Sequence, residues 1–156
     1  MKENNHTSEQ GTRAEAARRK MIQRQDSAEK EDAVRPMQPQ PRYERRLLDF
    51  IMKSILDIVG DEVPEIKRVR SWFVFSREEE LRTGYDGQCQ MPERRVGISE
   101  TILGPDADCS YTVAICIHEL CHIIHGGHGA DFLETNKRVM DIFNEKTGFN
   151  FRTDGG

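Results

Sequence analysis

Two histidines and a glutamate are spaced so that one helix would bring them to a single metal ion. His118 and His122 enclose Glu119 in the pattern His-Glu-Leu-Cys-His. Residues four apart lie on one face of an α-helix, about 6 Å apart along its axis, so both imidazoles can bind one zinc ion at about 2.0–2.1 Å. Zinc lowers the pKa of a bound water towards ~7, and a neighbouring carboxylate can then take its proton. The pattern predicts a zinc site with Glu119 as the catalytic base.

A third ligand is expected from beyond the glycine pair at 126–127. A turn there would bring the chain back over the helix and aim His128 at the same ion. Three protein ligands and one open position are typical of catalytic zinc, whereas structural zinc sites are closed. The rival ligand is His125, but on a continuing helix it would lie another ~4.5 Å along the axis. We therefore expect one catalytic Zn²⁺ ion on His118, His122 and His128.

The run of residues that carries this motif is otherwise apolar. Its apolar members are Val113, Ala114, Ile115, Cys116, Ile117, Leu120, Ile123 and Ile124. Polar side chains inside a buried run cost free energy unless they bind a metal or form hydrogen bonds. A metal site would remove that cost. The alternative is a set of core histidines that hydrogen bonds satisfy.

The elements that must position this site can be placed from hydrophobic spacing and turn residues. Leucine and isoleucine recur at three- and four-residue spacing over 41–59, which predicts a helix that stops at Gly60. The other expected elements are a strand over 68–76, a turn over 83–90, a strand over 94–99, a short turn or helix over 100–103, a loop over 104–106, the metal helix over 111–125, a final helix over 130–146 and a closing strand over 149–152. This order indicates an α+β fold with a small sheet of two or three strands.

The composition changes sharply near residue 42. Residues 1–41 contain no Leu, Phe, Tyr, Trp or Cys and close with three prolines. Such a segment cannot bury enough apolar surface to offset its chain entropy, so we expect a disordered N-terminal tail over 1–41 and one folded domain over 42–156. The formal net charge of −4 gives no overall basic character of the kind that dedicated nucleic-acid binders show.

The cysteines and the lack of long apolar runs bear on location. The four cysteines form no C-x-x-C pair, and Cys116 and Cys121 fall in the expected buried helix, where reduced thiols behave as small apolar residues. No apolar signal segment follows Met1, and no run approaches the ~18 apolar residues that span a bilayer. We expect an intracellular protein, in the cytoplasm or with DNA in the nucleus or nucleoid, and no membrane partner.

Three segments together resemble the SprT-like metallopeptidase domain. They are His-Glu-Leu-Cys-His at 118–122, Gly-His-Gly-Ala-Asp-Phe at 127–132 and Asn-Glu-Lys-Thr-Gly-Phe-Asn at 144–150. The turn at 82–84, Cys89 and the strand and short helix over 94–103 are similar to the same domain, so the resemblance covers roughly 47–153. It implies a minimal zincin-like metallopeptidase core, in which a small β-sheet packs on helices and the H-E-x-x-H helix is central.

Two features depart from the SprT pattern. Only five residues separate His122 from His128, which is shorter than in many SprT proteins and is similar to the compact H-E-x-x-H-x-x-x-x-x-H of the WLM proteases. No cysteine follows Cys121, so the zinc ribbon that many SprT proteins carry is missing from this sequence. Both departures leave the metal ligands in place and concern the choice of substrate.

The resemblance implies a zinc-dependent metallopeptidase. Its substrate would be a protein or peptide, and characterised relatives cut proteins covalently trapped on DNA in a DNA-dependent manner, which implies single-stranded or damaged DNA as a further partner. Two alternatives stay open: a catalytically silent metal-binding module for interaction or regulation, and a metal hydrolase that acts on a non-peptide bond. Retention of Glu119 favours the enzyme readings, because a pure binding module needs no general base.

Several further residues are candidates for supporting roles. Asp131 could orient a histidine ligand, or simply favour the start of the final helix. The candidates for an oxyanion donor are Tyr85, Tyr111 and His125. The residues that could form a basic and aromatic strip for unpaired bases are Arg68, Arg70, Arg82, Trp72, Phe73 and Tyr85. The alternative is that Trp72 belongs to the core and the arginines are solvated.

Overall fold

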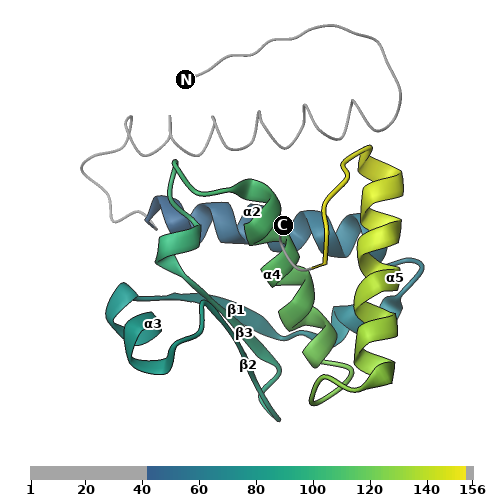
Figure 1. Ribbon diagram of the computed structural model, residues 1–156, viewed down its shortest axis with the longest axis horizontal. Helices are drawn as coiled ribbons and strands as arrows, with labels where there is room; N and C mark the ends of the chain where they lie inside the picture. The colour runs from purple at the N-terminus through teal and green to yellow at the C-terminus, as the bar shows by residue number, and fades with distance from the viewer. Residues whose placement is uncertain (1–41, 154–156) are drawn as a thin grey trace, which may run out of the picture.

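The computed structural model describes residues 42–153, which form an α+β fold with four helices, two short 3₁₀ helices and one three-stranded mixed sheet (Figure 1). The elements are α2 (Tyr43–Val59), η1 (Pro64–Arg68), β1 (Ser71–Phe75), α3 (Arg77–Thr83), β2 (Gly87–Gln90), β3 (Arg95–Ser99), η2 (Glu100–Ile102), α4 (Cys109–His122) and α5 (Ala130–Thr147). The predicted α+β class is confirmed. The tail expected over 1–41 lies outside the described residues.

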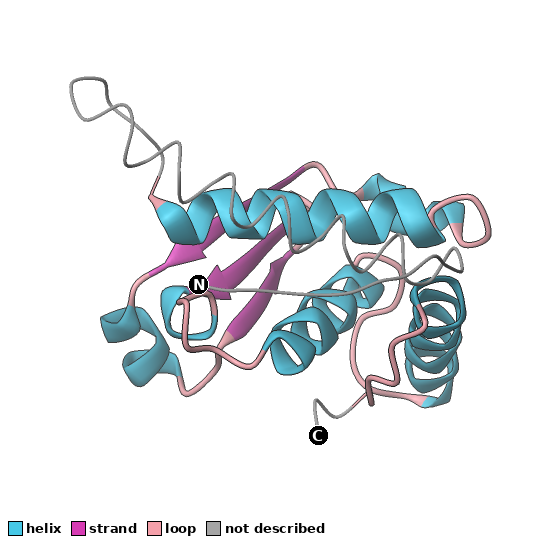
Figure 2. Ribbon diagram, turned by 90° about the horizontal axis from the view of Figure 1, so that it is seen from above, coloured by secondary structure: helices cyan, strands magenta, loops and turns pink. Residues whose placement is uncertain are grey.

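The sheet has the strand order β1-β3-β2, with β1 parallel and β2 antiparallel to the central strand. Val96 and Ile98 of β3 are fully buried and belong to the same core as the helices. Helix α2 crosses the strands and packs on β1, while α4 packs on β2 and β3 (Figure 2). Helices α2 and α4 therefore cover one face of a sheet whose two outer strands are β1 and β2.

Helix α4 lies at the centre of the domain. It packs on α2 and α5 as well as on the sheet, and six of its apolar residues are almost completely buried. Those residues are Val113, Ala114, Cys116, Ile117, Leu120 and Cys121. Full burial of such side chains contributes roughly 1.5–3 kcal/mol for each large one, so the central helix is firmly held. The expectation that two of the cysteines are buried thiols is confirmed for Cys116 and Cys121.

Several predicted boundaries are wrong. The strand expected from residue 68 begins at Ser71, because Pro64 opens a 3₁₀ helix that runs to Arg68. The turn expected over 83–90 holds only at its start, where Gly84 ends α3 with φ 81°. The second half of that segment is strand β2, whose ladder to β3 brings it into the sheet.

Two later elements also differ from their predicted positions, one because of helix capping and the other because of side-chain packing. The Asp108 side chain accepts a hydrogen bond from the Ser110 backbone and starts α4 at Cys109, and the helix ends at His122 rather than at residue 125. The closing strand expected over 149–152 is absent from the described residues. That segment is a loop in which the rings of Phe149 and Phe151 stack at 4.6 Å, and the Asn144 side chain bonds both backbone groups of Phe151.

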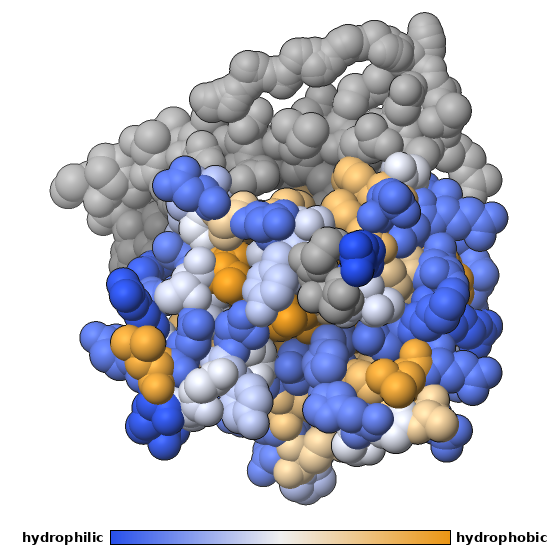
Figure 3. Space-filling model, viewed as in Figure 1, coloured by the Kyte–Doolittle hydropathy of each residue, from blue (hydrophilic) through white to orange (hydrophobic). Residues whose placement is uncertain are grey.

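The surface is mostly hydrophilic, and the large apolar residues on it are scattered. Leu81, Tyr85, Met91 and Leu133 are exposed. On the face seen in Figure 3, apolar residues form small separate patches among hydrophilic ones. Among residues 42–153, none of the helices has the length and apolar character needed to span a membrane.

Candidate metal centre

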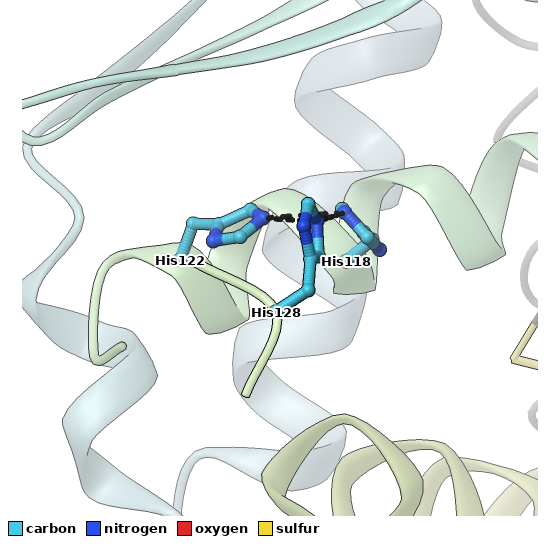
Figure 4. Close-up of side chains that lie close together, drawn as sticks. All are labelled: His118, His122 and His128. Atoms are coloured by element: carbon cyan, nitrogen blue, oxygen red, sulfur yellow. Dashed lines mark hydrogen bonds between the residues drawn. The ribbon is translucent and has the colours of Figure 1, made fainter. Parts of the chain in front are cut away.

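The three predicted metal ligands come together at the end of α4. His118 and His122 lie one turn apart on this helix, and both are half-buried. After the helix the chain turns at Gly127, whose φ of 71° is strained for any residue with a side chain. The turn returns His128 to the helix, and the three imidazoles face one another (Figure 4).

The distances among the three Nε2 atoms fit a single metal ion. The separations are 3.2 Å between His118 and His122, 3.1 Å between His122 and His128, and 3.2 Å between His118 and His128. Each imidazole nitrogen has either one hydrogen or one lone pair, so a closed triangle of three such nitrogens cannot be satisfied by hydrogen bonds alone. Tetrahedral zinc with bonds of about 2.0–2.1 Å would hold its nitrogens about 3.3–3.4 Å apart. The three histidines can therefore hold a metal ion.

Burial favours the neutral imidazoles that a metal requires. It lowers the pKa of His118 to about 4, with smaller contributions from His122 and His128. Burial also lowers the pKa of His122. A neutral imidazole offers a lone pair, so near neutral pH no proton has to leave these two rings before a metal binds.

Two neighbouring groups contact the predicted ligands. The Nδ1 atom of His122 lies 3.0 Å from the backbone carbonyl of His125, which can only accept a hydrogen bond. The ring of Phe132, itself 1% exposed, stacks on His122 at 4.3 Å and meets the edges of His118 and His128. Sequence reasoning missed the carbonyl, since it leaves no residue-type signal, and gave Phe132 as part of the segment over 127–132 that resembles the SprT-like domain.

The predicted general base lies in the same cleft as the histidines. Glu119 is 8% exposed, and burial followed by the charge of Asp86 raises the pKa of its carboxyl to about 7. The cleft has a volume of about 560 Å³. Its walls are Tyr85, Asp86, Gly87, Gln88, Cys89, Met91, Ile115, His118, Glu119, His122, Gly126, Gly127 and His128.

Strand β2 approaches Glu119 closely, and only glycine permits this approach. A Cβ atom at Gly87 would lie 2.7 Å from Oε2 of Glu119 and 2.8 Å from Cγ2 of Ile115. Both distances are shorter than a carbon atom tolerates. Gly87 and Asp86 were predicted only as turn residues, and the structure makes them one wall of the cleft.

The supporting residues proposed from the sequence lie in different parts of the structure. The Tyr111 hydroxyl donates to Asp86, and the His125 ring contacts Thr135 at 2.9 Å, so Tyr85 is the oxyanion candidate that lines the cleft. Asp131 is exposed in the first turn of α5, where its charge suits the helix N-terminus.

The expected basic and aromatic strip is divided between the two faces of β1. The indole of Trp72 packs against the core and donates to Asp49 at 2.7 Å. Its neighbour Phe73 points to the opposite face, where the Arg95 guanidinium lies 4.5 Å from the ring centre. The two aromatic rings therefore do not make one stacking surface.

Comparisons of this chain with family models, with curated proteins and with solved structures found no match.

Proposed function

We propose that this protein is a zinc-dependent metallopeptidase with a minimal zincin-like core of the SprT and WLM type. The observation that carries the proposal is the triangle of Nε2 atoms, 3.1–3.2 Å apart, in the cleft that also contains Glu119. Three histidine nitrogen ligands beside an acidic group are the donor set of a catalytic rather than a structural zinc ion. The sequence resemblance supports the same assignment.

The roles of the chain's own residues follow from their positions. Bound zinc would supply a water of lowered pKa and a Lewis acid for the scissile carbonyl. Glu119 takes a proton from the attacking water and passes it to the leaving amine, and its raised pKa suits a group that must both accept and give a proton. We assign Tyr85, which lines the cleft, as the donor to the developing oxyanion.

An extended polypeptide suits the cleft better than a small molecule. Strand β2 is an outer strand of the described sheet and supplies Gly87, Gln88 and Cys89 to the cleft wall. An outer strand presents backbone groups that can pair with an extended peptide. This observation favours a peptidase over a hydrolase of non-peptide bonds.

Association with DNA is a second part of the proposal. The hairpin that carries Met91 into the cleft wall continues into Arg94 and Arg95, and Arg70 lies beside it through a backbone bond of 2.8 Å to Arg94. Arg68 lies two residues before Arg70, so four arginines gather where β1 and β3 begin. Guanidinium groups at this end of the sheet would hold phosphates and so bring a protein bound to DNA close to the peptidase site.

The test is cleavage of casein by the zinc-loaded protein, with and without single-stranded DNA. We expect cleavage by the wild type, stimulation by DNA, and loss of cleavage in Glu119→Gln. The matched control is Glu134→Gln, which alters an exposed carboxylate on α5 and should keep full activity. Zinc binding without cleavage under either condition would replace the proposal with a catalytically silent metal-binding module.

A further inference from the structure

The link between α4 and α5 passes through a histidine that is not a metal ligand. His125 follows the end of α4 by three residues and is half-buried. We infer that His125 is a positioning residue, which fixes the ring of His122 and anchors the loop that carries His128. This role of His125 rests on the proposed zinc site, and it concerns a residue that contacts a metal ligand without binding the metal.

The backbone of His125 determines which nitrogen of His122 faces the metal position. A carbonyl oxygen only accepts, so at 3.0 Å from this oxygen Nδ1 of His122 must carry the hydrogen. In a neutral imidazole the other nitrogen then holds the lone pair. Nε2 of His122, 3.1–3.2 Å from the other two ligand atoms, is therefore fixed in the form that binds a cation.

The side chain and the amide of His125 hold that carbonyl in place. Its ring nitrogen Nε2 lies 2.9 Å from the hydroxyl of Thr135, one and a half turns into α5. Its amide donates to the Cys121 carbonyl of α4 at 3.0 Å. Residue 125 is therefore held to both helices and to a metal ligand at once.

The loop after His125 has few restraints of its own. Gly126, Gly127 and Gly129 surround His128, and all four residues are exposed. The next backbone hydrogen bond along the chain joins Leu133 to the Gly129 carbonyl. Glycine-rich segments lose more conformational freedom on ordering than others. The anchor at residue 125 therefore shortens the free segment that has to be ordered when His128 binds the metal.

The test compares Thr135→Val with Thr135→Ser. Valine keeps the branched shape and removes the hydroxyl, whereas serine keeps the hydroxyl. Zinc affinity is measured by competition with a chromogenic chelator. We expect Thr135→Val to weaken it about 10- to 100-fold, the effect typical of lost support for a ligand, while Thr135→Ser stays close to the wild type. The Tm of the metal-free variants should differ little from that of the wild type.

A second measurement reports on the ring itself. Nitrogen-15 shifts of His122 in the metal-free protein should show hydrogen on Nδ1 in the wild type and in Thr135→Ser, and a mixture of both forms in Thr135→Val. Zinc binding by the wild type with no change in either measurement for Thr135→Val would overturn the role of His125 and leave the metal site standing. If the wild type binds no zinc, the proposed function fails, and the nitrogen shifts alone decide whether His125 fixes the ring.

Discussion

At the scale of single residues, the candidate metal centre contains titratable groups whose charged forms are disfavoured by burial. His118 and Glu119 are adjacent on a mostly apolar helix. Burial lowers the pKa of His118 and raises the pKa of Glu119, so the neutral form of each is favoured. Neutral imidazole is the form that binds metal, so the burial of His118 does not oppose metal binding. For Glu119 burial is a cost in the metal-free protein at neutral to alkaline pH, because the ionised carboxylate loses its hydration.

Glu119→Gln should therefore stabilise the metal-free protein while it abolishes catalysis. The pKa of about 7 in the folded protein lies above the ordinary glutamate value of 4.5. The carboxyl thus contributes stability that is fully present below about pH 4.5 and is lost as the pH rises through 7. We expect the Tm of Glu119→Gln to exceed that of the wild type by a few degrees near pH 8 and to match it near pH 4. A variant that melts at or below the wild type near pH 8 would show that this carboxylate carries no such cost.

Gly87→Ala should impair catalysis without removing the metal. The added Cβ would approach Oε2 of Glu119 to 2.7 Å, so either β2 or the carboxylate must move. A displacement of this kind lowers kcat by about 10- to 100-fold, whereas the metal ligands come from α4 and its following loop. Peptidase rates and zinc content are the measurements. The control is Gly104→Ala, where a Cβ meets nothing within 4 Å, and equal kcat values in the two variants would contradict the account.

At the scale of elements, the sequence predicted those helices that bury a continuous apolar face. Helices α2, α4 and α5 and strand β3 lie close to their expected positions, since their apolar residues recur with the period of the element. Helix α3 was missed because all of its residues are at least partly exposed and it has no apolar stripe. Strand β2 was missed because its four residues are half-buried and its pairing with β3 decides its conformation.

A carboxylate of the missed helix α3, that of Glu80, ties this helix to the end of the central strand. Glu80 accepts a hydrogen bond from Ser99 at 2.5 Å and another from the Thr101 hydroxyl, at the point where β3 passes into η2. These hydroxyls, Ser99 first, lower the pKa of Glu80 below the ordinary glutamate value of 4.5. The stability that Glu80 contributes is present above about pH 4.5 and is lost as the pH falls through the lowered value.

Glu80→Gln should lower stability at neutral pH and have little effect in acid. We expect a loss of about 1 kcal/mol at pH 7, because hydrogen bonds to a charged group are stronger than neutral ones and this group is partly exposed. Thermal melts at pH 7 and pH 3 make the comparison. Glu78→Gln, an exposed change in the first turn of the same helix, is the control. Equal losses of stability in the two variants at pH 7 would show that the hydrogen bonds of Glu80 do not stabilise the fold.

At the scale of the whole molecule, the fold gathers the cleft from segments that are distant in the sequence. Spacing alone placed the three histidines and Glu119, since a helix and a glycine turn are local features. The opposite wall, which includes Tyr85, Asp86 and Gly87, comes from a segment more than thirty residues earlier. Its position depends on the β2–β3 pairing and on the packing of α4 against β2, neither of which leaves a local pattern.

The most direct test of the account is the metal content of the purified protein, measured by elemental analysis without chelators. We expect about one zinc per chain in the wild type, the number that three histidine ligands can hold. His128→Ala should lose the zinc. Leu133→Ala should keep it, because Leu133 is an exposed residue in the first turn of α5. A wild type without zinc, or a His128→Ala variant that retains it fully, would show that His118, His122 and His128 do not form the metal centre.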